Sequence, residues 1–393
     1  MSPAPLSAPE RRAALDTLCH HLADTAVARD RAGGTAKAER DAIRRSGLLS
    51  LAIPEAYGGA GEAWPAILGA VRTLARVDSS LAHLFAFQHL MIASVLLYAN
   101  PTQRAGLLTA TARRNLFWGN ALNPLDRRTA LTPSGEDRWV LSGIKSFCSG
   151  ATDSDRLLVS ADGPDGVLRV LALPTDRPGI TVHNDWDAIG QRQTDSGTVS
   201  FTEVAVSASD LLGPPGPFGD VASSLRPCIA QAILASLYLG IAEGALAAAR
   251  DFTLTDGRPW RASGVATAAE DPYLLHHVGE AQLAIASADA LGGVALDRLQ
   301  TAWNRGRGLE AAERGETALA IATFKLAAAR AGLDAANRLF DITGARGAAA
   351  RHGFDRFWRN IRTHSLHDPL DYKLKELGVW ALTGALPEPG FYS

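Results

Sequence analysis

The sequence predicts an α+β protein in which a β domain lies between two helical domains. The chain has 393 residues, which is more than one hydrophobic core usually covers. Its first and last thirds repeat apolar residues three and four positions apart, and its middle third alternates apolar and polar residues. We expect an N-terminal helical domain over 1–114, a middle β domain over 115–213 and a C-terminal helical domain over 214–393.

The N-terminal third is rich in Ala, Leu and Arg, and segments such as LDTLCHHLADTAV and WPAILGAVRTLARV have helical periodicity. Its main interruption is IPEAYGGAGE, where one proline and three glycines indicate a loop. The middle third contains the alternating runs RWVLSGIKSFCSG, DRLLVSA, GVLRVLALP and GTVSFTEVAV, which predict strands. After the linker PPGPFGD, long Ala and Leu periodicity returns, so the last third is again expected to be helical.

Composition narrows the class of protein. The formal net charge of -2 provides no basic field for nucleic acid or for an anionic membrane, so we expect neither partner. The three cysteines, Cys19, Cys148 and Cys228, form no CxxC pair, which argues against a disulfide framework and a structural zinc site. The N-terminus lacks the apolar core of a signal peptide, and we expect no stretch long and apolar enough to span a bilayer. These features favour a cytoplasmic protein.

Common catalytic motifs are absent: the sequence has no GxSxG, HExxH, Walker loop or GxGxxG after a strand. A polar cluster, FDRFWRNIRTHSLHDP, lies near the C-terminus. His364, His367 and Asp368 have a spacing that would suit a metal, but no third ligand is close in the sequence. We therefore favour hydrogen-bonded or helix-capping histidines and predict no metal.

Two segments of the middle third have both a structural and a functional interpretation. RWVLSGIKSFCSGATDSD has the form of a hairpin whose polar end includes Ser149, and NDWDAIGQRQTDSGTVSF combines Trp186 with a turn. Spacing alone does not decide between the two interpretations.

Four segments in order resemble the acyl-CoA dehydrogenase superfamily over nearly the whole chain: IPEAYGGAGE, GIKSFCSGATDSD, GQRQTDSGTVSFTEVAVSASDLLG and LYLGIAEGALAAARDF. The resemblance implies a β-barrel-like middle domain and a C-terminal four-helix bundle. It does not fix the chemistry, because dehydrogenases, oxidases and monooxygenases share this fold.

Two departures from the dehydrogenases point to another branch. Where those enzymes carry a catalytic glutamate followed by glycine, this chain has Asp368 and Pro369, preceded by His367. A shorter carboxylate would be badly placed to remove a proton, since a displacement of about 1 Å can cost ~100-fold in rate. Where those enzymes hold the FAD pyrophosphate with an arginine, this chain has Thr253, and Arg258 is the nearest cation.

Both departures recur in the flavin monooxygenases of the superfamily, and the chain is especially similar to the dibenzothiophene monooxygenase family. The resemblance implies a two-component enzyme that receives reduced FMN or FAD from a separate NAD(P)H flavin reductase and uses O2. The flavin C4a-hydroperoxide would then oxygenate a small aromatic or heteroaromatic substrate, indole-like or thiophene-like, at carbon, nitrogen or sulfur.

Carried over by the same resemblance, the site residues fall into three groups. The catalytic residues would be His367, Ser149, Asn120 and Asp368. The cofactor would be bound by Phe147, Ser149, Trp186, Arg258 and Asn120, and the substrate pocket would be lined by His89, Phe87, Phe117 and Trp118. An imidazole with an ordinary pKa near 6.5 suits proton transfer at neutral pH, which is why His367 is the expected reaction centre.

Two alternatives remain open at this point. One is an acyl-CoA dehydrogenase that uses Asp368 as its base, and the other is a helical binding or scaffold protein that has kept the fold without the flavin. Long Ala, Leu and Gly stripes in the C-terminal helices also predict a homotetramer, or at least a dimer.

Overall fold

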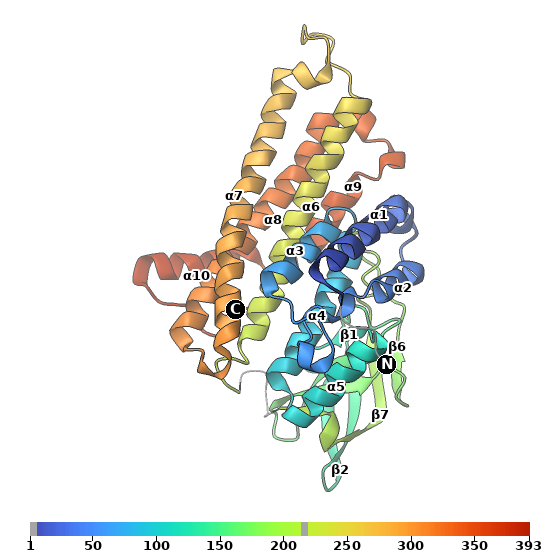
Figure 1. Ribbon diagram of the computed structural model, residues 1–393, viewed down its shortest axis with the longest axis vertical. Helices are drawn as coiled ribbons and strands as arrows, with labels where there is room; N and C mark the ends of the chain where they lie inside the picture. The colour runs from blue at the N-terminus through green and yellow to red at the C-terminus, as the bar shows by residue number, and fades with distance from the viewer. Residues whose placement is uncertain (1–5, 214–218) are drawn as a thin grey trace.

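The computed structural model describes residues 6–213 and 219–393, so most of the predicted linker PPGPFGD lies outside the described residues. The molecule is elongated, with the sheet and the N-terminal helices towards one end and three long helices extending to the other (Figure 1). The helical, β and helical order expected from the sequence is confirmed.

Five helices form the N-terminal part, and their ends are set by short-range chemistry. The Asp78 side chain accepts a hydrogen bond from the backbone N–H of Leu81, and Asn100 caps the following helix in the same way, with Pro101 at its first position. The IPEAYGGAGE segment is a loop with one 3₁₀ turn, as predicted. The helices are α1 (Ala8–Ala32), α2 (Lys37–Arg45), α3 (Trp64–Ala75), α4 (Ser79–Tyr98) and α5 (Pro101–Arg114).

The middle part is one eight-stranded sheet with the order β6-β7-β3-β2-β4-β5-β8, and β1 pairs in parallel with β4. A single residue pair, Ala130 with Asp162, joins β2 to β4, so the ladder is shortest between these two strands. The strands are β1 (Trp118–Ala121), β2 (Thr129–Gly135), β3 (Arg138–Lys145), β4 (Arg156–Asp162), β5 (Leu168–Pro174), β6 (Ile180–Val182), β7 (Val199–Ser207) and β8 (Leu211–Leu212).

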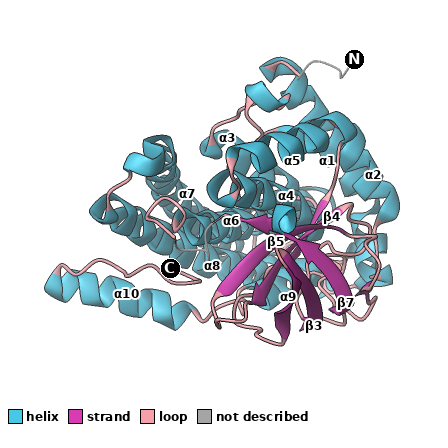
Figure 2. Cartoon of the chain, turned by 90° about the horizontal axis from the view of Figure 1, so that it is seen from below, coloured by secondary structure: helices cyan, strands magenta, loops and turns pink. Residues whose placement is uncertain are grey.

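Four helices of the C-terminal part pack as a bundle, and a fifth stands away from it, as both ribbon views show (Figures 1 and 2). The bundle comprises α6 (Leu225–Thr255), α7 (Pro272–Arg305), α8 (Ala311–Gly347) and α9 (Asp355–His364), and the outlying helix is α10 (Leu370–Thr383). Gly344, with a φ of 63°, interrupts the helical backbone near the end of α8.

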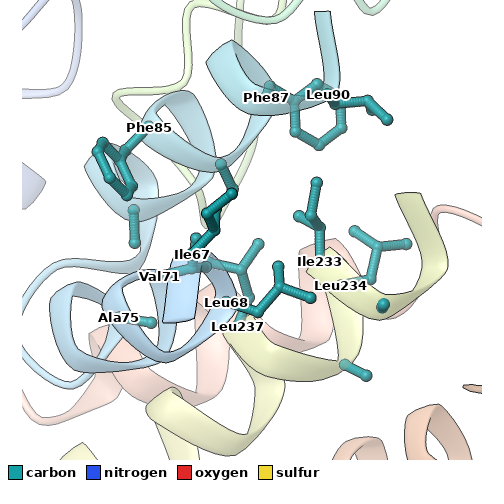
Figure 3. Packing of buried hydrophobic residues seen from close by; sticks show 14 of the residues in the cluster. Ile67, Leu68, Val71, Ala75, Phe85, Phe87, Leu90, Ile233, Leu234 and Leu237 are labelled. Atoms are coloured by element: carbon teal, nitrogen blue, oxygen red, sulfur yellow. The ribbon is translucent and has the colours of Figure 1, made fainter. Parts of the chain in front are cut away.

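The main hydrophobic core lies where α3, α4 and α6 meet (Figure 3). Two glycines of α6 allow this close approach. A Cβ at Gly240 would lie 2.5 Å from the carbonyl oxygen of Arg72, and one at Gly244 would lie 2.2 Å from that of Arg76. The sheet has its own smaller core. The N-terminal helices are therefore packed against the bundle itself, which brings α4 close to the end of α9.

One expectation about the sequence was wrong. Two helices, α4 and α6, are long and apolar enough to cross a membrane by length and composition. In this fold, 89% of the apolar window of α4 and 78% of that of α6 is buried inside the protein. Their apolar character is accounted for by the core they form, in line with the interpretation of Cys228–Ala249 as a buried helix.

Candidate active site

A group of middle-domain residues gathers beside β1, and we call Asn120, Phe147, Ser149 and Trp186 the middle-domain cluster. The backbone N–H of Asn120 donates to the carbonyl oxygen of Ser149 at 2.9 Å. The rings of Phe147 and Trp186 stand edge-on with 6.2 Å between their centroids. Phe147 is 64% exposed and has a φ of 59°, so the backbone turns to hold a large apolar ring at the surface.

A chain of hydroxyl groups lies behind this cluster. The Ser149 Oγ is 2.8 Å from the Ser196 Oγ, which is 2.8 Å from the Thr194 Oγ1. The carbonyl oxygen of Gln191 accepts hydrogen bonds from both Trp186 Nε1, at 2.9 Å, and Thr194 Oγ1, at 3.0 Å. Aromatic edges beside hydroxyl and amide groups fit a planar heteroaromatic ring with a polar rim, and the isoalloxazine of a flavin is such a ring.

Arg40 of α2 binds the backbone and the side chains next to the middle-domain cluster. Its guanidinium is fully buried and donates from Nη1 to Asp195 Oδ2 and from Nη2 to the carbonyl oxygen of Gly150, both at 3.0 Å. The same group lies 4.6 Å from the centroid of the Phe117 ring. One side chain therefore fixes the backbone next to Ser149 and the turn next to Thr194.

Three histidines gather where α4 meets the end of α9, and we call His83, His364 and His367 the histidine cluster. The His83 and His364 rings are 4.8 Å apart and nearly perpendicular. Tyr238 of α6 contacts His364 and donates a 2.9 Å hydrogen bond to its carbonyl oxygen. Burial lowers the pKa of His83 to about 3 and that of His364 well below its ordinary value, so both rings are neutral at ordinary pH.

His367 differs from the other two because its side chain is 38% exposed and has a polar partner. Its Nδ1 is 3.1 Å from Asp368 Oδ1, and that oxygen also accepts a 2.6 Å hydrogen bond from Lys325 Nζ. Burial alone would raise the pKa of Asp368, but the hydrogen bonds from His367 and Lys325 outweigh it and keep this carboxyl ionised. Within residues 6–213 and 219–393, no group of three or more His, Cys, Asp or Glu side chains could hold a metal ion.

A polar junction joins the two clusters. Asn360 of α9 accepts a 2.7 Å hydrogen bond from the backbone N–H of Gln191 and donates a 2.9 Å bond to Ser79. One turn farther along, α4 carries His83 and α9 carries His364. The middle-domain cluster and the histidine cluster therefore lie on either side of one junction between the three parts of the fold.

Arg258 is not brought to these clusters within one chain. It lies in the loop between α6 and α7, at the opposite end of the molecule from β2 (Figure 1). Gln231 contacts Asp368 near the start of α6, and the helix continues to Thr255. A rise of about 1.5 Å per residue places that helix end about 36 Å farther along.

The residues expected in the substrate pocket have different surroundings. Phe87 packs on His83, with 4.0 Å between ring centroids, so it belongs to the histidine cluster side of α4. His89 is fully buried and contacts Phe85. Each of these two residues lies two positions after a member of the His83–Phe87 pair and therefore faces another side of α4. Their spacing explains the split, because positions three or four apart share a helix face and positions two apart do not.

Phe117 and Trp118 are buried where the N-terminal helices pack against β1 and the residue before it, with Phe117 beside Arg40 of α2. The Trp118 indole donates to Thr111 Oγ1 at 3.0 Å, and the Trp118 backbone N–H donates to Gln88 Oε1 at 2.8 Å. The structure does not bring these two rings to the histidine cluster, because β1 places them on the side where the N-terminal helices pack.

Sequence reasoning missed His83, Gln231, Tyr238 and Lys325. All four lie in long apolar helices, where a single polar residue resembles an ordinary interruption of the pattern. The signal that could have found them is a polar side chain on the apolar stripe itself, as with the lysine in ALAIATFKLAAARAGL.

Comparison with protein-family models supports the same architecture. The chain matches the acyl-CoA dehydrogenase N-terminal domain over residues 10–115, the middle domain over 122–204 and the C-terminal domain over 232–372.

Three relatives are similar over almost their entire length. The probable FMNH2-dependent monooxygenase SfnC of Pseudomonas putida is 52% identical, covering 99% of this chain and 100% of that protein. The structure of methanesulfinate monooxygenase MsuC from Pseudomonas fluorescens is 51% identical with a TM-score of 0.96, covering 99% and 100%. The dibenzothiophene monooxygenase TdsC of Paenibacillus sp. A11-2, with FMN and indole, is 41% identical with a TM-score of 0.94, covering 98% and 99%. The chain belongs to the flavin-dependent monooxygenase branch of the acyl-CoA dehydrogenase family.

Proposed function

We propose that this chain is an FMNH2-dependent monooxygenase that transfers one oxygen atom from O2 to the sulfur of a small organosulfur compound. The observation that carries the proposal is the position of His367: it is partly exposed, held by the ionised Asp368, and separated from the middle-domain cluster by a single polar junction. A separate NAD(P)H flavin reductase would supply the reduced flavin, as the two-component nature of the branch implies.

The middle-domain cluster is suited to hold the flavin ring. Phe147 and Trp186 offer apolar edges, and Ser149 and Asn120 offer a hydroxyl and an amide to the polar rim of the ring. FMN is favoured over FAD because Thr253 uses its hydroxyl within α6, bonding the carbonyl oxygen of Ala249 at 2.8 Å, and offers no cation to a second phosphate.

Reduced FMN, when bound, supplies the two electrons that activate O2. One oxygen atom goes to the substrate and the other leaves as water, which carries the two protons that the reduced flavin would lose on reoxidation. His367 can hold or move a proton at its Nε2, because Asp368 engages its Nδ1. Tyr392 packs on His367, and Phe87 packs on His83 beside His364; these rings would limit the entry of water, which would otherwise divert reduced flavin to peroxide.

A small sulfur compound is favoured as the substrate by the similarity of the chain to its relatives. The relatives named for FMNH2-dependent and methanesulfinate oxygenation are 52% and 51% identical, whereas the dibenzothiophene monooxygenase TdsC is 41% identical. An alkanesulfinate, which gains one oxygen atom to become a sulfonate, is such a compound.

A fused heteroaromatic substrate is the second candidate. It is favoured by the similarity to the dibenzothiophene enzyme, whose structure contains indole, and by the exposed ring of Phe147. An acyl-CoA dehydrogenase activity is disfavoured, because Asp368 is buried, ionised and already bonded to Lys325 and His367, so it is a weak base.

A homo-oligomer, and specifically the tetramer expected from the sequence, is part of the proposal. Large apolar side chains are exposed on the two outer helices: Leu283 and Val294 on α7, and Trp380 and Leu382 on α10. Arg258 can bind the phosphate of a flavin only in a neighbouring copy, given its distance along α6. A cytoplasmic location is also part of the proposal, because all three cysteines are free thiols, which suits a reducing compartment.

The test is an assay of the purified protein with a flavin reductase, NADH, FMN and O2. Methanesulfinate should be converted to methanesulfonate, measured by ion chromatography, with product approaching one per NADH. Indole and dibenzothiophene form parallel arms, and product from these alone would replace the sulfur proposal by the second candidate. No oxygenated product in any arm, together with bleaching of bound flavin by an acyl-CoA, would return the chain to the dehydrogenases.

A further inference from the structure

Lys325 is a buried cation that the proposed reaction does not use directly. It lies in the middle of α8, and only 1% of its side chain is exposed. Moving an ammonium group out of water costs free energy, so a buried lysine needs hydrogen bonds and an ion-pair partner to offset that cost. Burial lowers the pKa of Lys325, while the adjacent Asp368 opposes that shift.

Side chains from two helices and from the turn after α9 meet at one carboxylate oxygen. Lys325 Nζ donates to Asp368 Oδ1 and to Gln231 Oε1, both at 2.6 Å. His367 Nδ1 lies 3.1 Å from the same Oδ1. Gln231 is fixed in turn, because its amide Nε2 faces Asp368 Oδ1 at 3.5 Å. The carboxylate is thus held from α6 and α8 on one side and contacts the imidazole on the other.

The direction of the His367 hydrogen bond follows from the charge of its partner. An ionised carboxylate only accepts hydrogen bonds, so the neutral His367 ring must carry its proton on Nδ1. Its Nε2 is then left as the atom that can accept or deliver a proton. If Asp368 lost its charge or its position, the imidazole could take the other tautomer and present a different atom.

We propose that Lys325 is a positioning residue: it holds Asp368 ionised and in place, so that His367 keeps its proton on Nδ1 and presents Nε2 to the reacting atoms. This inference rests on the proposed function for the identity of the reaction, but the geometry it describes belongs to the protein without flavin.

Other titratable groups near His367 must be separated from this effect. His83 on α4, His364 on α9 and Tyr392 in the C-terminal tail lie near His367, whereas Tyr238 on α6 lies near Asp368, and Lys373 and Glu376 on α10 lie near Lys325. Lys373 offers a matched control, because it is also a buried lysine, with 5% of its side chain exposed, and bonds Glu376 at 2.9 Å.

The experiment follows modification of His367 by diethylpyrocarbonate, which reacts with unprotonated imidazole, in the full-length protein without flavin. The rate at His367 is measured by peptide mass spectrometry against pH for the wild type, Lys325→Met and Lys373→Met. In Lys325→Met, removal of the cation leaves Asp368 to pair with His367 alone, so the midpoint of the rate profile should move to higher pH. Lys373→Met should keep the wild-type midpoint.

Product formed per NADH provides the second readout. Lys325→Met should lose roughly tenfold or more of its product at neutral pH while its oxygen consumption continues. An unchanged modification profile in Lys325→Met would overturn the proposal. If the modification profile of Lys325→Met is shifted but the wild-type protein oxygenates no tested substrate, the positioning role is supported and the proposed function is not. The failure of one proposal can therefore be told from the failure of the other.

Lys325→Met removes the lysine partner of a buried carboxylate and can fail to fold. Asp368→Asn and the double variant Lys325→Met/Asp368→Asn therefore complete a cycle. If Lys325 acts only through the charge of Asp368, the double variant should have the same modification profile as Asp368→Asn. A further shift on adding Lys325→Met in that background would show that Lys325 acts on His367 by another route and would overturn the proposal.

Discussion

Tyr392 stands edge-on to His367, with 5.4 Å between the ring centroids and an angle of 88° between the ring planes. The last residues of the chain hold it there: Arg314 of α8 is fully buried and donates to the carbonyl oxygen of Ser393. Leu386 of the same tail packs against Gly315, where an added Cβ would lie 2.8 Å from it. The C-terminal tail thus covers part of His367 with the Tyr392 ring.

Replacement of the Tyr392 ring should therefore uncover His367. In Tyr392→Ala we expect a several-fold lower yield of product per NADH and a matching rise in hydrogen peroxide, because water gains access to the reacting flavin. Tyr392→Phe keeps the ring and should match the wild type. Equal yields in all three proteins would mean that the tail does not protect the site.

His367→Ala tests the reaction centre. Product formation should fall by ~100-fold or more while flavin binding and oxygen consumption continue, since unprotected reduced flavin still reacts with O2. The measurement is the ratio of peroxide to product. His276→Ala, at an exposed histidine of α7, is the control. A His367→Ala protein with wild-type product per NADH and a lower melting temperature would assign this residue to packing alone.

His89 gives a prediction about acid stability. Both of its ring nitrogens are buried without a partner, and burial lowers its pKa to about 3. Its unfolded pKa is about 6.5, so the unfolded chain binds more protons between these values and stability falls as the pH falls through that window. At pH 5 this cost is about 2 kcal/mol for one such residue.

His89→Leu should consequently raise the melting temperature at pH 7 and reduce its loss between pH 7 and pH 5. The first effect comes from removing an unpaired buried polar group, worth ~1–3 kcal/mol, and the second from removing the titration. Thermal unfolding at the two pH values measures both. A lower melting temperature with a loss of product would instead support the pocket role expected for His89 from the sequence.

Arg40 should be essential to the middle-domain cluster. Arg40→Met removes the donor to Gly150 and leaves Asp195 buried without its partner, a change that typically costs ~3–5 kcal/mol. The double variant Arg40→Met/Asp195→Asn should recover most of the melting temperature but retain a weaker affinity for FMN, because the backbone beside Ser149 is no longer held. Titration of flavin fluorescence measures the affinity, and unchanged binding in the double variant would limit Arg40 to a stabilising role.

Periodicity predicted the three-part fold because amphipathic helices and alternating strands leave a regular pattern. Ser149 and Trp186 could be proposed only from the resemblance to the family, because the spacing around them did not decide between a turn and a functional site. Lys325 and His83 could not be placed in the same way. Their role depends on which helices pack against each other in three dimensions. The residues that Lys325 contacts lie 43 and 94 positions away in the sequence.

Arg258 shows a different limit. The resemblance assigned it to the flavin phosphate, but within one chain it follows the end of α6, which lies about 36 Å along the helix from Gln231, the residue that contacts Asp368. If it binds FMN, it must do so from a neighbouring copy. Arg258→Ala should weaken FMN binding by roughly 1.5–3 kcal/mol without unfolding the protein, the value of a charged hydrogen bond. Unchanged affinity would place the phosphate elsewhere.

Mixing two inactive proteins distinguishes binding within a chain from binding between chains. Arg258→Ala lacks the phosphate contact, and His367→Ala lacks the reaction centre. If each site takes His367 from one copy and Arg258 from another, random assembly of equal amounts should leave roughly a quarter of the sites with both residues, following the symmetry of a closed oligomer. The mixture, assembled by co-expression and assayed at an FMN concentration that Arg258→Ala alone does not bind, should regain product. If both residues act within one chain, every site lacks one of them and the mixture stays as inactive as its components.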